Sequence, residues 1–394
     1  MPPNDNVDFV VLSDEWFGLP FSCKHILRHF LAEHRLFWVE TIGLRAPGLN
    51  LYDIRRASSK IFSWVWNKKI QENTVPDNLY LINPLQLPYN HIPFVREFNK
   101  WLLVKKVKQS QHYSQKKAKV LITTWPFVAN LVGSFDEVLS VYYRVDDYAE
   151  FPGVRRESMC RLEKELIRKV DMIVATAEQL GDLDISGKPI YYLPHGVDFD
   201  HFSMRRDEPI TELPIERIPS PRIGFFGLLS SWIDFDLLAQ VASQEPGWSF
   251  IFIGPSQIPE SDIPKAPNIF FLGPIPYEEL PKHAHYFDVG LIPFKINALT
   301  LAVNPLKLME YFAIGVPVVS TPLPEVTKYK DHARIASGPD AFREAIKKAL
   351  DEDSSCLSKM RKEIARAHGW EQKSNQFRRW IGEALERKIG LSSK

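Results

Sequence analysis

Short apolar runs alternate with longer amphipathic stretches along most of the chain. This alternation is typical of repeated βα units that build a parallel sheet. Helical segments such as KHILRHFLAEH and SMCRLEKELIRKV separate the predicted strands. The apolar runs predict strands at 9–12, 36–41, 79–84, 119–125, 138–145, 172–177 and 190–196, then at 222–227, 249–255, 268–274, 289–294 and 316–321.

The pattern is interrupted between the two series of strands. The segment MRRDEPITELPIERIPSPR is rich in charge and proline and has no sustained periodicity, as expected of an interdomain linker. We therefore predict an α/β protein of two tandem Rossmann-like, doubly wound domains with an interdomain cleft, because such sheets bind ligands beyond the carboxyl ends of their strands. The predicted parts are a first domain at 1–200, a linker at 201–222, a second domain at 223–370 and a helix at 371–394 that packs back on the first domain.

Composition narrows the class of protein. The 394 residues exceed what one core usually supports, and 45% hydrophobic with 25% charged residues describes an ordinary globular chain. A net charge of +1 argues against nucleic acid as a partner. The start lacks the features of a signal peptide and no apolar run reaches spanning length, so we expect a cytoplasmic protein. Cys23, Cys160 and Cys356 have neither metal-ligand spacing nor a disulfide pattern.

The stretch NPLKLMEYFAIGVPVVST carries the first candidate chemistry. Asn304 is a good N-cap, Pro305 suits the first helical position, and Gly315 stops the helix. A lysine in the first turn, Lys307, is mildly unfavourable at the positive end of the helix dipole unless an anion is also present. The alternative is that Lys307 extends into solvent.

The chain resembles the GT-B glycosyltransferases, and it does so over almost its whole length. The residues that carry the resemblance are FLGPIPYEELPKHAHYFDVGLIPF, the following NPLKLMEYFAIGVPVVST, and LPHGVDFDHF at the domain junction. It is strongest to bacterial enzymes that build surface polysaccharides, such as teichuronic-acid-type glycosyltransferases. The key positions are also similar to those of xanthan-type glucuronosyltransferases.

The resemblance implies roles for individual positions in the second half. Lys307 would approach the nucleotide diphosphate, and Glu310 would bond the ribose hydroxyls. A diphosphate at a helix N-terminus is stabilised by the dipole and the free N–H groups, which would explain the lysine. The alternative for Glu310 is a solvated i,i+3 partner of Lys307. The resemblance also implies where the rest of the donor would lie. The base would contact Pro274 and Ile275, with Tyr277 nearby, and the phosphates and sugar would contact Gly227, Leu228 and Leu229. The helix start at Asn304, Pro305 and Leu306 and, at the domain junction, His195 complete the implied binding residues.

Two departures from the family pattern bear on mechanism. Retaining members carry a glutamate where this chain has Ala302, and they carry an arginine and a lysine after the glycine turn that are absent here. An inverting reaction needs a general base on the acceptor side instead. The resemblance to xanthan-type enzymes places the catalytic aspartate at Asp147, with Asp146 orienting it or acting in its place. The alternatives are a metal site, which no Cys or His cluster completes, and a simple helix cap.

A segment of the first half combines aromatic and basic residues. Lys100–Lys117 places Trp101 and two leucines among six lysines, and KIFSWVWNKK at 60–69 repeats the mixture. Such segments suit an anionic membrane surface, and they equally suit an ordinary amphipathic helix with a solvated face. Peripheral contact with the inner face of the membrane is therefore one expectation.

The sequence thus favours a metal-independent glycosyltransferase in surface polysaccharide synthesis, which needs no cofactor beyond its donor. The donor expected from the resemblance is a UDP-sugar, with UDP-glucuronate as one candidate, and the acceptor is a glycan or a lipid-linked molecule. Two alternatives stay open. One is a sugar-nucleotide epimerase of the same fold, and the other is a non-catalytic nucleotide-sugar-binding module.

Overall fold

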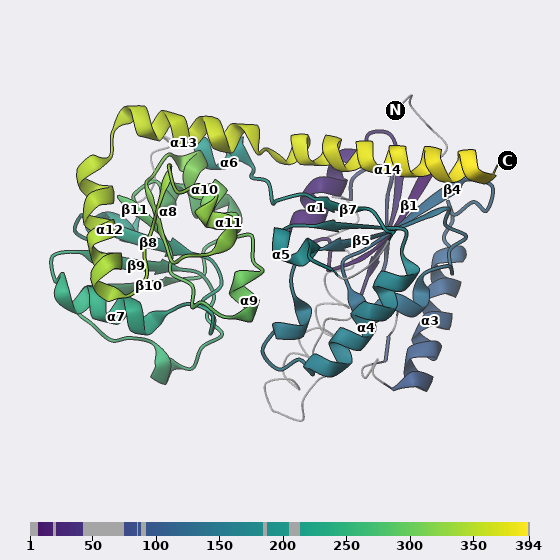
Figure 1. Cartoon of the computed structure of the whole chain (residues 1–394), viewed down its shortest axis with the longest axis horizontal. Helices are drawn as coiled ribbons and strands as arrows, with labels where there is room; N and C mark the ends of the chain where they lie inside the picture. Colours follow the sequence, from purple (N-terminus) through teal and green to yellow (C-terminus); the bar gives the residue numbers. More distant parts are fainter. Residues whose placement is uncertain are drawn as a thin grey trace. The chain divides into compact units, whose positions relative to one another are not determined.

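The computed structural model describes residues 7–18, 21–41, 75–84, 86–87, 92–183, 187–204 and 213–392. The chain divides into two compact units, each built around its own parallel sheet (Figure 1). The segment KIFSWVWNKK and residues 205–212 of the predicted linker lie outside the described residues. The first unit comprises Met1–Thr176, Leu180–Leu193 and Ser374–Lys394, and the second comprises Ala177–Gln179 and Pro194–Lys373.

The first unit contains a seven-stranded sheet in the order β3-β2-β1-β4-β5-β6-β7. Every described pairing in it is parallel, and every residue of β1 is buried. A parallel strand covered on both faces has no solvent side, which is why these strands appear as continuous apolar runs. The strands are β1 Val7–Ser13, β2 Arg35–Glu40, β3 Leu79–Ile82, β4 Ala118–Thr123, β5 Leu139–Arg144, β6 Met172–Ala175 and β7 Ile190–Tyr192.

Helices cover both faces of this sheet. Successive side chains of a strand point to opposite faces. On one face, Val10 packs in a cluster with Leu103 of α3 and with residues of α4. On the other, Phe9 contacts Phe30 at a centroid distance of 5.1 Å, and Phe30 contacts Phe377 of α14 at 6.3 Å. The helices are α1 Ser22–Leu27, α3 Pro93–Lys108, α4 Arg156–Lys169, α5 Glu178–Gly181 and α14 Trp370–Ser392, of which α5 and α14 contain residues of both units.

The C-terminal helix is fixed to the first unit from Ser374 onward. The Ser374 hydroxyl donates to the Ile26 carbonyl at 2.9 Å, and the Arg378 guanidinium pairs with Glu33 at 2.9 Å. Among the helices of the described chain, α14 included, none is both long and apolar enough to cross a membrane.

The second unit contains a six-stranded parallel sheet in the order β10-β9-β8-β11-β12-β13. Its core joins Leu238 of α7, Phe312 of α10 and Ile346 of α12 to the strands. The strands are β8 Arg222–Phe226, β9 Ser249–Ile253, β10 Ile269–Gly273, β11 Val289–Ile292, β12 Val318–Ser320 and β13 Ala333–Ile335. The helices are α6 Phe199–Ser203, α7 Phe235–Gln244, α8 Leu280–Ala284, α9 Ala298–Leu301, α10 Leu306–Ile314, α11 Pro324–Thr327, α12 Pro339–Glu352 and α13 Ser355–Ala367.

The predicted fold class, two tandem Rossmann-like α/β domains, is confirmed. Each predicted apolar run overlaps an observed strand. The prediction missed the edge strand β13, which pairs with β12 through Val318 and Ala333. Its three residues Ala-Arg-Ile do not form an apolar run, so local pattern alone carries no signal for it.

Candidate functional site

Three glycines mark the carboxyl ends of neighbouring strands in the second unit. Gly227 follows β8, Gly254 follows β9 and Gly273 ends β10, with φ angles of +140°, +141° and +74°. Glycine adopts such positive φ angles without the steric cost that a Cβ imposes. The Gly227 N–H donates to Ile253 and the Gly254 N–H to Gly273, each at 2.8 Å. Backbone hydrogen bonds therefore join the turns along this edge of the sheet. Because the residues are glycines, only backbone atoms occupy these positions.

Replacing Gly254 by alanine is expected to lower the free energy of unfolding by about 2–3 kcal/mol. An added Cβ would lie 1.9 Å from the Gly227 carbonyl oxygen, in addition to the strain of a φ of +141°. Gly133→Ala is the matched control, because Gly133 has a φ of +85° and nothing within 4 Å of an added Cβ. Denaturant unfolding of the two variants separates the clash from the strain. Equal losses in both would contradict the close approach of the two turns.

Lys307 and Glu310 stand beside these turns on the first turns of α10. The Lys307 ammonium donates to Glu310 Oε2 at 2.7 Å and lies 5.0 Å from the Phe226 ring centroid. Its Cε would be 2.9 Å from a Cβ at Gly227, so the lysine stem crosses the glycine turn. The two side chains are 19% and 10% exposed. The expected i,i+3 pair thus exists, but it is largely buried rather than solvated.

The start of α10 differs from the prediction. Asn304 is not the N-cap, because its side-chain amide donates to Glu325 Oε2 at 3.3 Å instead. Pro305 holds the cap position in an extended conformation and offers no side-chain acceptor, and the first turn contains no acidic residue. The first helical residue is Leu306. The N–H groups of this turn therefore have no side-chain cap, and Lys307 is the charged side chain nearest to them in sequence.

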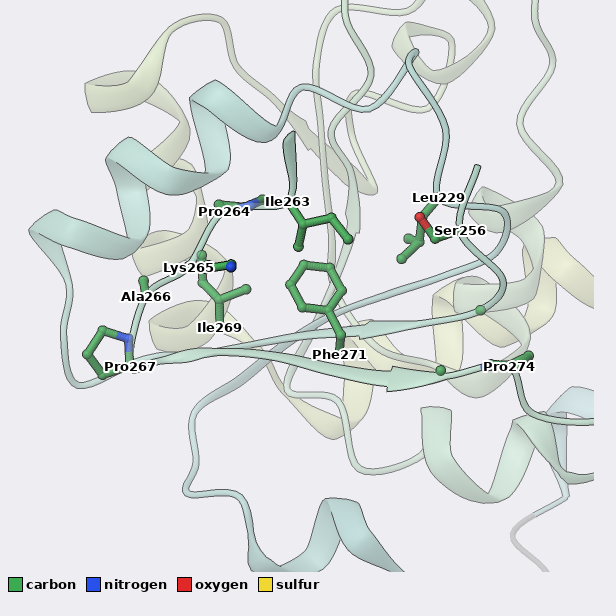
Figure 2. A pocket seen from close by; sticks show the side chains of 12 residues that line it. Leu229, Ser256, Ile263, Pro264, Lys265, Ala266, Pro267, Ile269, Phe271 and Pro274 are labelled. Atoms are coloured by element: carbon green, nitrogen blue, oxygen red, sulfur yellow. The ribbon is translucent and has the colours of Figure 1, made fainter. Parts of the chain in front are cut away.

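A cavity of about 630 Å³ opens next to the same strand ends. Figure 2 shows Phe271 of β10 pointing toward Ile263, with Leu229, Ser256 and Pro274 on one side of the cavity. Its volume is in the range of small-molecule sites, and most of its lining is apolar. The lining residues are Leu229, Gly254, Ser256, Ile263, Pro264, Lys265, Ala266, Pro267, Ile269, Phe271, Gly273 and Pro274.

The residues predicted to bind the nucleotide sugar do not all lie in one place. Leu229 and Pro274 line the cavity, whereas Gly227, Lys307 and Glu310 form the cluster beside it. Three more of these residues lie near the strand ends without joining either group. Leu228 is half-buried, Ile275 packs against the core, and Tyr277 turns toward α6.

Tyr277 and His195 have surroundings that the sequence did not indicate. The Tyr277 ring stacks on His201 at 4.4 Å, and its carbonyl lies 2.9 Å from His201 Nε2. His195 lies 6.4 Å from the Trp370 ring, and its buried Nδ1 has no hydrogen-bond partner within the described residues. Burial and the nearby charge of Lys373 lower the pKa of His195 to about 3. His195 is therefore a neutral imidazole and supplies no positive charge for a phosphate.

In the first unit, the strand VYYRV is anchored by a buried ion pair. The Arg144 guanidinium donates twice to Glu163, at 2.8 and 2.9 Å, and once to the Leu180 carbonyl at 2.7 Å. The Tyr142 hydroxyl donates to the same Glu163 carboxylate at 2.7 Å. A buried bidentate pair of this kind fixes geometry more than it adds stability. It holds the end of β5 from which Asp146 and Asp147 follow.

The two aspartates differ in their environments. Asp147 accepts a hydrogen bond from the Ala149 N–H at 3.2 Å and caps the 3-10 helix Tyr148–Glu150, which was one of the alternatives the sequence left open. Burial, followed by the charges of Asp147 and Asp14, raises the pKa of Asp146 to about 7. Asp146 is thus the carboxyl group whose protonation changes near neutral pH, as a general base requires.

Asp14 is the acidic residue that sequence reasoning missed. It follows β1, which is separated from β5 by β4 alone, so both carboxyl ends lie at the same edge of the sheet. Burial and the charge of Glu15 raise the pKa of Asp14 to about 6. Burial raises the pKa of Tyr148 well above its usual range, and the charges of Asp146, Tyr142 and Asp14 add to this effect. The sequence does show an aspartate directly after the first predicted strand. That position indicates a site residue only once the strand order is known.

Within the part of the chain that the structure describes, no group of His, Cys, Asp or Glu is arranged to hold a metal ion. Cys23 is buried, and burial raises the pKa of its thiol. Cys160 and Cys356 stand apart as free thiols. The described residues therefore give no cysteine a catalytic environment.

A known protein family matches part of the second unit. Residues 220–352 match the family of glycosyl transferases group 1. The Bacillus subtilis protein TuaH, named as a teichuronic acid biosynthesis glycosyltransferase, is 27% identical over 242 residues. The alignment covers 58% of this chain and 61% of TuaH, so it spans less than two thirds of that relative.

Solved structures extend the likeness to almost the whole chain. Anabaena HepE in complex with UDP-glucose aligns with a TM-score of 0.65 at 12% identity, over 95% of this chain and 99% of HepE. The trehalose-phosphate synthase (UDP-forming) of Burkholderia xenovorans, in complex with glucose-6-phosphate, gives 0.59 at 12% identity over 95% and 100%. At this identity the likeness establishes the fold alone. Residues 220–352 are therefore similar to group 1 glycosyl transferases, and the chain has the GT-B fold.

Proposed function

We propose that this protein transfers a sugar from a nucleotide sugar to a glycan or lipid-linked acceptor in surface polysaccharide synthesis. The observation that carries the proposal is the cluster of Lys307, the Gly227 turn and the uncapped N-terminus of α10. Backbone N–H groups and a lysine at a helix start are suited to a diphosphate. The names of TuaH and of the HepE complex support a polysaccharide role and a UDP-linked donor.

The donor is proposed to be a UDP-sugar, with UDP-glucuronate as one candidate. Its diphosphate would lie at the start of α10, where Lys307 neutralises the charge of the departing nucleotide. Glu310, one turn on, would accept from the ribose hydroxyls. The base would occupy the neighbouring cavity, whose Phe271 offers an aromatic surface and whose Pro274 lies on the turn after β10.

The reaction is proposed to invert the anomeric configuration. The acceptor hydroxyl oxygen attacks the anomeric carbon, the bond from that carbon to the diphosphate oxygen breaks, and the hydroxyl proton passes to a carboxylate. We assign this proton to Asp146, because Asp147 is engaged in a helix cap and Asp146 titrates near neutrality. Ala302, at the position of the retaining-type glutamate, is consistent with inversion. The scheme assigns no step to a metal or a further cofactor.

Incubation of the full chain with a panel of UDP-sugars, with and without acceptor, tests the proposal. Free UDP that appears only when the acceptor is present supports transfer. An isomerised sugar nucleotide in the absence of acceptor would show an epimerase of the same fold. Thermal stabilisation by a nucleotide sugar without any turnover would show a binding module. Either of the last two results would overturn the proposed reaction.

A further inference from the structure

Helix α3 presents its aromatic residues to solvent. Phe94, Phe98 and Trp101 are 80%, 38% and 55% exposed. They recur at intervals of four and three residues and therefore share one face of the helix. The Phe98 and Trp101 rings lie 6.0 Å apart, which makes them one continuous apolar strip. Exposed aromatic residues gathered in this way usually mark a surface that contacts a partner or a membrane.

The opposite face of α3 binds the helix to the first unit. Leu103 and Val107 are at most 2% exposed, and Asn99 is 5% exposed. The Asn99 amide bonds both the N–H and the carbonyl of Leu87, each at 2.8 Å. An ordinary amphipathic helix buries its largest apolar side chains, whereas α3 buries two aliphatic residues and leaves three aromatic residues outside. This exposure of the aromatic residues favours a surface contact over an ordinary amphipathic helix, the two alternatives that the sequence left equal.

Lysines accompany the aromatic strip. The Lys105 ammonium lies 5.0 Å from the Trp101 ring centroid, on the same face. Lys100 and Lys106 lie on either side of that face by their helical positions, and the structure gives neither an ion pair within the described residues. Lys108 pairs with Asp136 at 3.0 Å and is already neutralised. The surface therefore combines aromatic groups with uncompensated positive charge.

We propose that this face of α3 docks on the surface of an anionic lipid bilayer. Aromatic rings settle at the level of the lipid headgroups, and lysines are attracted by the negative surface potential. The one acidic residue of α3, Glu97, accepts from the Asn130 amide at 3.0 Å, so its carboxylate already has a partner within the protein. Each lysine near an anionic surface increases binding by roughly fivefold. Charge complementarity thus favours lipid over an uncharged protein surface.

The inference does not depend on the proposed transfer reaction. Docking is measured without donor, acceptor or turnover, so the two proposals can fail separately. If both hold, docking would bring the first unit to the surface where a lipid-linked acceptor resides.

Co-sedimentation with vesicles tests the proposal. The full chain should bind vesicles of phosphatidylcholine mixed with phosphatidylglycerol, bind pure phosphatidylcholine weakly, and dissociate as the salt concentration rises. The double variant Phe94→Ser/Trp101→Ser should weaken binding by about tenfold or more, and Lys105→Glu/Lys106→Glu by a similar factor. These side chains are exposed, so thermal unfolding should show an intact fold in both variants.

Matched controls come from the second unit. Met360 of α13 is 41% exposed, and Lys347 and Lys348 form an exposed pair on α12. Met360→Ser and Lys347→Glu/Lys348→Glu should change vesicle binding by no more than about twofold. Equal losses in the controls, unchanged binding of the α3 variants, or no binding by the unmodified chain would overturn the proposal. Self-association that the α3 variants abolish, without vesicle binding, would instead identify a protein interface and equally overturn it.

Discussion

Replacing Asp146 by asparagine is expected to slow sugar transfer by about 10²–10⁴-fold, because the acceptor hydroxyl loses its proton acceptor. The same change should stabilise the fold at neutral and higher pH. The pKa of Asp146 is about 7 in the folded chain and 3.8 as a free side chain. The folded chain therefore binds this proton more tightly, and ionisation of Asp146 removes folded-state stability as the pH rises from 3.8 to about 7. Asparagine does not ionise, so we expect a gain of roughly 1–3 kcal/mol in the free energy of unfolding.

The pH dependence distinguishes Asp146 from its neighbour. In the unmodified protein, kcat/KM should fall as the pH drops below about 7, since the base becomes protonated. Asp147→Asn is the control, because asparagine can still cap the 3-10 helix and removes a charge that raises the pKa of Asp146. Asp147→Asn should therefore move this limb of the profile to lower pH without abolishing transfer. Nearly full transfer by Asp146→Asn, or a loss of stability in it, would contradict the assignment.

Replacing Lys307 by alanine is expected to weaken the transition state by about 2–4 kcal/mol, which is about 30- to 1,000-fold in kcat/KM. The lysine is the cation placed against the Gly227 turn and the start of α10. Its loss also leaves the Glu310 carboxylate, 10% exposed, without its partner at 2.7 Å. The free energy of unfolding should therefore fall by about 1–3 kcal/mol. Unchanged turnover in a folded Lys307→Ala protein would contradict the role.

Two further variants separate the catalytic loss from the structural one. Lys328 forms a similar i,i+3 pair with the buried carboxylate of Glu325 at 2.9 Å. Lys328→Ala should lose less stability, because the Glu178 N–H and the Asn304 amide still donate to Glu325, and it should have a much smaller effect on transfer. Lys307→Ala/Glu310→Gln should regain most of the stability, because no buried charge is left unpaired, and should still transfer very slowly.

The continuous apolar runs were sufficient to predict both sheets, because buried parallel strands must be apolar on both faces. They could not predict strand order. β1 pairs with β2 and with β4, and this arrangement depends on how helices cross the sheet rather than on any local signal. The edge strand β13 was missed for a related reason, since Ala333–Ile335 is a strand only because β12 lies beside it.

The candidate site was predictable at positions where the residue type is unusual for its local structure or follows from helical spacing. Lys307 at a helix start is an unusual choice, and Glu310 follows from helical spacing. The cavity wall around Ile263–Pro267 has no periodicity, and its shape comes from the path of the chain between β9 and β10. Asp14 could not be connected to Asp146 before the sheet placed their strand ends at one edge. Asn304 was predicted as a helix cap from its residue type, but its side-chain amide donates a hydrogen bond to Glu325 instead.

The most direct measurement is a proton NMR spectrum of the product while it is fresh, made by the unmodified chain from a UDP-sugar and an acceptor. The account predicts a new glycosidic linkage whose anomeric configuration is opposite to that of the donor, because an activated hydroxyl displaces UDP in one step. A linkage with the donor's configuration would contradict Asp146 as the general base of an inverting transfer. The absence of a glycosidic product with every UDP-sugar and acceptor supplied would contradict the proposed function itself.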